Sequence, residues 1–166
     1  ITANYDVKYY HADQELTNLE IPYGVASIGD RAFENCHDLT NVSFSSSLVK
    51  IGDKAFENCI GLTKVDLPSY VTSIGESAFS MCTNLTDLTL PPSLISIHQR
   101  AFVCCEKLKE ISFPSSLTFI GNYSFFGCNG LSSVTLPSNL TSVGFYAFSF
   151  CEGLTSVTLS PSLTFM

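Results

Sequence analysis

The seven cysteines are the residues of this chain best suited to chemistry, because thiols can form disulfides, bind zinc or act as nucleophiles. Six of them follow one another at intervals of 23 residues: Cys36, Cys59, Cys82, Cys105, Cys128 and Cys151. Evenly spaced, equivalent positions offer no cysteine a preferred partner, so we expect buried free thiols rather than a ladder of disulfides. Zinc is not expected, since no C-x-x-C pair or histidine accompanies these positions. Cys104 stands outside the series, and we expect it alone to lie near the surface.

Histidines and carboxylates offer little sign of catalysis. The three histidines, His11, His37 and His98, have unrelated positions, and no hydrolase, zinc-protease or phosphate-loop motif occurs. We therefore expect no enzymatic activity, no catalytic or metal-binding residue and no cofactor.

One acidic series could bind calcium. Asp30, Asp53 and Glu76 are also 23 residues apart, and Arg31 and Lys54 flank the first two. Without a D-x-D or glycine-rich nonapeptide motif, a solvated face of alternating charge is the better interpretation.

The 23-residue interval organises the whole chain and predicts a solenoid. An Ala-Phe pair recurs at positions 32, 55, 78, 101 and 147, with Ser-Phe at 124. Each repeat contains an L-x-x-V-x-L pattern, which predicts a short parallel strand that proline then ends. A glycine follows at positions 29, 52, 75, 121 and 144, where we expect positive φ; His98 replaces it once. The segment from glycine to cysteine predicts a helical or 3₁₀ turn with its Ala-Phe pair facing inward.

The pattern LTxVxLPxSLxSIGxxAFxxC, seen in residues 62–82 and 131–151, resembles the BspA-type leucine-rich repeat. The resemblance implies an α/β-type repeat solenoid that is right-handed, with 23-residue coils and one strand in each. It also implies a cell-surface or secreted protein with a role in adhesion or protein binding, and it brings no catalytic residues.

The two ends depart from the repeat. Residues 1–15 predict a degenerate first coil or cap, in which Tyr10 is in register with Phe33, and residues 16–166 form the predicted solenoid. The chain begins at Ile1 and stops in mid-repeat, which is typical of a piece of a longer array.

Charge narrows the partners. A net charge of −7 argues against nucleic acid and against an anionic membrane surface. No apolar run approaches the roughly 18 residues of a membrane-spanning helix, so we expect no membrane insertion of this segment. Four sequons, at Asn41, Asn84, Asn122 and Asn139, leave glycosylation open.

The outward residues of the predicted strands form the candidate binding face, because such positions vary without harming a repeat core. Towards the N-terminus these are Asn18, Glu20, Asn41 and Ser43. The face then continues through Lys64, Asp66, Asp87, Thr89, Glu110, Ser112, Ser133, Thr135, Ser156 and Thr158. It changes from charged to hydroxylated along the chain.

A second candidate surface is aromatic. Residues 111–166 contain one charged side chain, Glu152, and residues 1–110 contain the other 22. Columns that are polar in early repeats become aromatic in late ones, and this predicts a contact patch of Phe119, Tyr123, Phe126, Phe145, Tyr146 and Phe150. A neighbouring domain or further coils could equally cover it.

These observations predict a non-enzymatic module that binds a protein or glycoconjugate through either surface, with possible homo-oligomers through the C-terminal coils. The main alternative is a structural spacer or self-assembling segment of a longer surface protein. A third option is recognition of an ordered lattice by the hydroxyl series Thr89, Ser112, Thr135 and Thr158, which its mixed composition disfavours.

Overall fold

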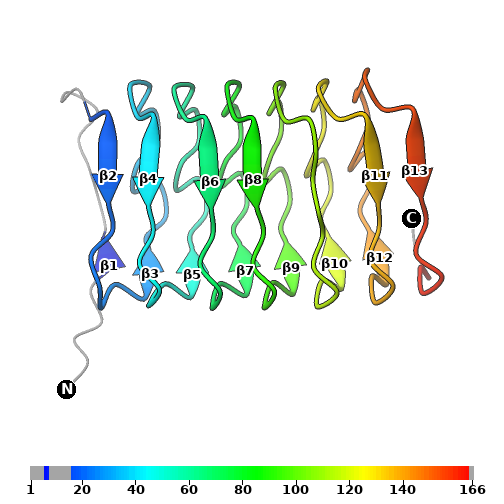
Figure 1. The fold of residues 1–166 in the computed structure, drawn as a ribbon, viewed down its shortest axis with the longest axis horizontal. Helices are drawn as coiled ribbons and strands as arrows, with labels where there is room; N and C mark the ends of the chain where they lie inside the picture. The colour runs from blue at the N-terminus through cyan, green and yellow to red at the C-terminus, as the bar shows by residue number, and fades with distance from the viewer. Residues whose placement is uncertain (1–5, 8–15, 165–166) are drawn as a thin grey trace.

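The chain forms a row of stacked coils in which equivalent positions are 23 residues apart, as the pairing of Ser27 with Lys50 and of Ser73 with Ser96 shows (Figure 1). This arrangement is a computed structural model that describes residues 6–7 and 16–164. The predicted solenoid is confirmed, but each coil differs in detail from the expected strand plus helical turn.

A second short strand in each coil is the first difference. The apolar pairs that we expected to form a return segment, such as the one ending at Ile51, instead build a continuous seven-stranded parallel sheet. Its strands in spatial order are β1 (Asp6–Val7), β3 (Ser27–Ile28), β5 (Lys50–Ile51), β7 (Ser73–Ile74), β9 (Ser96–Ile97), β10 (Phe119–Ile120) and β12 (Ser142–Val143). This sheet holds successive coils together from one end of the row to the other.

The strands that the sequence predicted do form, but they pair only two at a time. They are β2 (Asn18–Glu20), β4 (Asn41–Ser43), β6 (Lys64–Asp66), β8 (Asp87–Thr89), β11 (Ser133–Thr135) and β13 (Ser156–Thr158). The hydrogen-bonded pairs are β2 with β4, β6 with β8, and β11 with β13. Residues 110–112, at the equivalent position of the fifth coil, form no strand. The predicted sheet is therefore interrupted.

The core is a stack of phenylalanines between the two sheets. Phe33, Phe56, Phe79, Phe102 and Phe125 are fully buried, and consecutive rings stack with centroids 5.2 to 5.5 Å apart. Offset stacks of this spacing add to the free energy gained by burying the rings. The inward prediction for the Ala-Phe pairs is confirmed.

The predicted helical turn is wrong. In the second coil Ala32 N–H donates to Gly29 and Cys36 N–H donates to Phe33, each three residues back, whereas the intervening Phe33 N–H donates to Ala55 of the next coil. Two positions in this segment also have left-handed backbone, with φ of 59° at Arg31 and 63° at Asn35. A helix needs uninterrupted right-handed residues, so consecutive turns form instead. No residue that the structure describes is helical.

The prediction of positive φ in the glycine column is also wrong. Among the described glycines, positive φ occurs at Gly24 and Gly127, outside that column, and His98 is not left-handed either. The column needs glycine for space: a Cβ on Gly75 would lie 2.6 Å from the carbonyl carbon of Gly52 in the preceding coil. Glycine thus permits the close approach of backbones.

The boundary predicted between residues 15 and 16 remains a prediction. β1 pairs in parallel with β3, with Asp6 opposite Ser27, so the seven-stranded sheet begins before residue 16. Tyr10 lies outside the described residues.

Candidate functional site

The candidate binding face is exposed as predicted. All ten of its side chains from Lys64 to Thr158 face solvent, and the apolar residues between them, such as Val65 and Val134, are buried. Alternation along each short strand produces this arrangement, because neighbouring side chains point to opposite sides of a strand.

One ion pair organises the charged part of the face. Lys64 Nζ lies 2.7 Å from Asp66 Oδ2, and Thr89 Oγ1 donates to Asp66 Oδ1 at 2.7 Å. The hydrogen bond from Lys64, followed by that from Thr89, lowers the pKa of Asp66, and the same contact raises the pKa of Lys64. Asp87 and Glu110, the next carboxylates along the face, have no ion pair within the described part of the chain.

A cleft opens where the sheet is interrupted. It lies between β8 and residues 109–112 and has a volume of about 710 Å³. Its walls are Thr86, Asp87, Leu88 and Thr89 on one side and Lys109, Glu110, Ile111 and Ser112 on the other. A smaller hollow of about 350 Å³ continues it past Leu90 and Phe113. Sequence analysis missed this cleft, although it placed four of the lining residues on the binding face.

The cleft also bears on recognition of a regular lattice. Thr89 and Ser112 lie on opposite walls of the cleft, whereas Thr135 and Thr158 are partners in a paired sheet. The hydroxyl series is therefore unevenly spaced, which disfavours recognition of a repeating surface.

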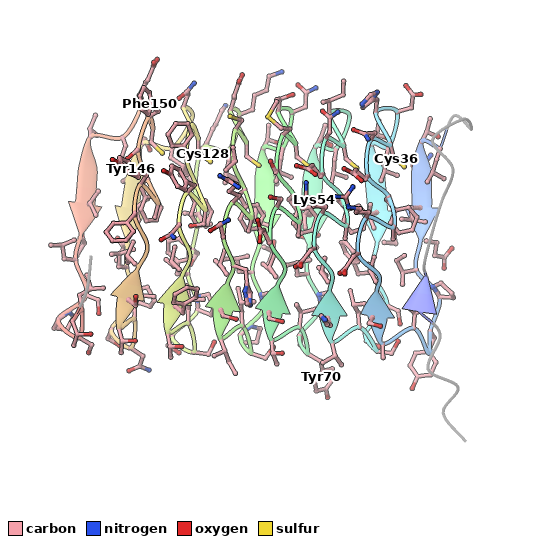
Figure 2. All side chains as sticks on the ribbon, turned by 180° about the vertical axis from the view of Figure 1, so that it is seen from behind. Cys36, Lys54, Tyr70, Cys128, Tyr146 and Phe150 are labelled. Carbon is pink, nitrogen blue, oxygen red and sulfur yellow. The ribbon has the colours of Figure 1, made fainter. Side chains whose placement is uncertain are left out.

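The aromatic residues form a cluster on the turn edge of the last coils. Tyr123 stacks on Tyr146 with centroids 5.2 Å apart, and Phe126 contacts Phe150 at 5.0 Å. Tyr146 and Phe150 are 60% and 70% exposed, and Figure 2 shows them together near the C-terminal end of the row.

The remaining aromatic residues lie around this cluster. Arg100 lies over the Tyr123 ring at 5.6 Å, where a cation is attracted to the ring face. Phe145 is 57% exposed. Phe119 belongs to β10 and lies 6.5 Å from the His98 ring, and no ring contact joins it to the cluster among the described residues.

The acidic series has a structural role that the sequence did not reveal. Asp30 Oδ1 accepts the Asp53 N–H at 2.9 Å, and Asp53 Oδ1 accepts the Glu76 N–H at 2.8 Å. Asn122 does the same for Phe145 at 2.8 Å. These side chains therefore link neighbouring coils. No group of acidic, histidine or cysteine side chains suited to a metal ion occurs in the described part of the chain.

The sequon asparagines include further links between coils. The side-chain amide of Asn84 donates to Ile60 O at 2.7 Å, and that of Asn139 donates to Ser115 O at 2.8 Å. Asn41 donates to Asn18 Oδ1 at 3.0 Å.

The cysteine predictions are confirmed for burial. All seven cysteines are free thiols, six are buried, and Cys104 is partly exposed. Each thiol from Cys59 onward in the column donates to a phenylalanine carbonyl 26 residues earlier, as Cys82 does to Phe56 at 3.4 Å. Burial raises the pKa of every thiol in the column, that of Cys82 to about 12. These groups are poor nucleophiles near neutral pH.

Known proteins identify the class to which this fold belongs. The family model described as the BspA type leucine-rich repeat region matches residues 6–132 and 96–166, so the chain belongs to the BspA-type leucine-rich repeat family. No curated protein matches the chain. Within the described residues, no helix is long and apolar enough to cross a membrane.

Solved structures agree with this assignment. A leucine-rich repeat protein of T. pallidum has 33% sequence identity and a TM-score of 0.70, over 88% of this chain and 60% of its own. One from Bacteroides ovatus has 32% identity and a TM-score of 0.72, over 88% of this chain and 46% of its own. The chain thus spans about half the length of these relatives. A leucine-rich cell surface protein of Faecalibacterium prausnitzii shares the fold, with 24% identity and a TM-score of 0.55, over 90% of this chain and 60% of its own.

Proposed function

We propose that this chain is a non-enzymatic protein-binding or adhesion module of a cell-surface or secreted protein, and that it contacts its partner through the binding face. The observation that carries the proposal is the exposure of all ten face side chains on a backbone that the seven-stranded sheet and the phenylalanine stack hold rigid. A preorganised surface loses little conformational freedom when a partner binds. The mixed charges and hydroxyls of the face can set specificity without disturbing the core.

The proposed location draws on the family. The F. prausnitzii protein with this fold is described as a cell surface protein. The buried state of the six column thiols is compatible with an oxidising environment, because buried thiols are shielded from oxidants and from each other's surface partners.

The test compares two pairs of bulky substitutions in a capture experiment with surface-protein extracts. Thr135→Arg with Thr158→Arg places bulk on the binding face, and Ser115→Arg with Ser138→Arg places the same charge at exposed turn positions away from it. We expect only the first pair to abolish capture. Equal capture by both variants, or no capture by the unaltered protein, would contradict a binding role for this face.

The alternative is a spacer or self-assembling segment. It is favoured by the continuous seven-stranded sheet, which gives reach with little flexibility, and by the exposed aromatic cluster near one end. Under this alternative the face variants leave every interaction unchanged, and the ligand is bound elsewhere in a longer protein.

A further inference from the structure

The cleft between β8 and residues 109–113 exposes backbone groups that are paired elsewhere in the array. Asp87 N–H donates to Thr63 O and Leu67 N–H donates to Thr89 O, so Asp87 and Thr89 direct their backbone groups towards β6. Alternate residues of a parallel strand point to opposite neighbours, so Leu88 and Leu90 direct theirs into the cleft. Neither leucine has a backbone hydrogen bond among the described residues.

The facing wall is equally unpaired. Residues 109–113 have no backbone hydrogen bond within residues 6–7 and 16–164. Glu110 and Ser112 occupy the repeat positions of Asp87 and Thr89, so their N–H and C=O groups point back towards β8. Both walls therefore present donors and acceptors suited to an extended chain lying between them.

The first of two departures from the repeat at this cleft is Lys109, in a column that otherwise holds threonine or serine. At three coils the threonine hydroxyl of this column donates to the preceding coil, as Thr40 does to Thr17 O at 2.9 Å and Thr86 does to Thr63 O at 3.1 Å. Thr155 makes the third such bond at 3.1 Å. Lysine cannot reproduce this short link.

The second departure is His98 in the glycine column, between the same two coils. A Cβ at the equivalent glycines of neighbouring coils would approach the preceding backbone to 2.6 Å, at both Gly75 and Gly121. The side chain of His98 therefore requires its coil to sit farther from the preceding one. The two departures together account for an opening at this place.

The charge of the walls indicates what enters. Asp87 and Glu110 occupy equivalent positions on opposite walls, both are exposed, and neither has an ion pair in the described part of the chain. Two like charges that face one cleft favour a cation between them. Lys109 lies beside Glu110 on one wall only.

We propose that the cleft binds an extended segment of a protein partner as an added β-strand and places an arginine or lysine of that segment between Asp87 and Glu110. The mode is strand addition to an unpaired sheet edge, in which backbone hydrogen bonds supply affinity and side chains supply specificity. An inserted strand needs walls about 9.6 Å apart, twice the spacing of neighbouring strands. The pairing of β9 with β7 and β10 on the other sheet holds the coils while this side opens. The inference rests on the proposed protein-binding function and specifies the partner's chemistry.

The probe is a blocked hexapeptide of alternating valine and arginine, titrated against the protein by fluorescence anisotropy. Amide exchange measured by NMR should be fast at Leu88, Leu90, Glu110 and Ser112 in the free protein and at least tenfold slower at saturation. The same peptide with glutamate in place of arginine, or with alternate amides N-methylated, should bind at least tenfold more weakly. Equal binding of the N-methylated peptide, or none of the unmodified peptide at millimolar concentration, overturns strand addition.

Two variants of the protein locate the site. Asp87→Asn with Glu110→Gln should weaken binding at least tenfold, whereas Asp38→Asn with Glu152→Gln, an equal charge change at exposed positions elsewhere, should not. Unchanged binding by the first variant overturns the charge assignment.

The second variant restores the repeat. His98→Gly with Lys109→Thr should close the cleft, slow the same amides without peptide and abolish binding. Equal peptide binding by this variant overturns the site. If the peptide fails while capture still depends on Thr135 and Thr158, which lie outside the cleft, the inference falls and the proposed function stands.

Discussion

At the residue scale, the cysteine column combines burial with a specific hydrogen bond. The thiols of Cys59, Cys82, Cys105, Cys128 and Cys151 each donate to a phenylalanine carbonyl at 3.1 to 3.4 Å. The thiol is small enough to fill the core and still supplies a donor to a carbonyl that the turn ladder does not use. A serine would bring a stronger donor but less apolar surface.

Stability should fall at alkaline pH because of these thiols. The folded pKa of Cys82 is about 12, against 9.0 for an ordinary thiol, so the unfolded state loses its proton first. The stabilisation is complete below pH 9 and is lost between about pH 9 and 12, at about 1.4 kcal/mol per pH unit for this thiol. Urea unfolding at pH 8 and pH 10.5 measures the slope. Cys82→Ala should reduce it, and an unaltered slope would contradict ionisation of this residue.

Truncation of the core should cost far more than truncation of the face. Phe102 is fully buried and stacks on Phe79 and Phe125, so Phe102→Ala should lower the free energy of unfolding by about 3 to 5 kcal/mol. Thr89→Ala removes one exposed hydrogen bond to Asp66 and should cost less than about 1 kcal/mol. Chemical denaturation compares the two, and similar midpoints would refute the assignment of the columns.

At the element scale, links between coils determine how the turns and strands stack. Turn residues donate alternately within their own coil and to the next coil, and the acidic column adds a side-chain link beside them. Each coil is therefore joined to its neighbours at the turn and at the seven-stranded sheet, and the face strands are free to pair or separate.

Asp53 tests the acidic link. Asp53→Ala leaves the Glu76 N–H without its acceptor and should destabilise the protein by about 1 kcal/mol, whereas Asp53→Asn keeps an acceptor oxygen and should be nearly neutral. Thermal unfolding of both variants measures the difference. Because we assign the column to structure, millimolar calcium should not shift the midpoint of the unaltered protein; a calcium-dependent shift would restore the metal interpretation.

At the scale of the whole molecule, charge and apolar exposure are separated along the row. All charged side chains but Glu152 lie in residues 1–110. The C-terminal coil exposes Val157 and Leu159 by 45% and 55%, beside a hollow of about 570 Å³ that Phe145 and Tyr146 also line. An apolar surface without charge repulsion favours association.

We predict that this chain self-associates through its C-terminal coils. Phe145→Ser with Tyr146→Ser should weaken the oligomer seen by light scattering and leave the fold intact. Tyr23→Ser with Tyr70→Ser is the matched control, because these tyrosines are 85% and 67% exposed and Figure 2 shows Tyr70 on the opposite edge of the coils from Phe150. A monomer at high concentration would contradict the prediction.

The sequence by itself determined the repeat length, the inward columns and the burial of the thiols, because a 23-residue period forces equivalent side chains into equivalent environments. It also placed the ten outward residues of the face, since alternation along a strand is a local property.

Only the tertiary structure decided how coils contact one another. The second strand ending at Ile51, the spatial need for Gly75 and the link from Asp53 to Glu76 all depend on atoms 23 residues away in sequence. The cleft beside β8 has the same origin, because Lys109 and His98 are single departures whose effect appears only when their coil is stacked on its neighbour.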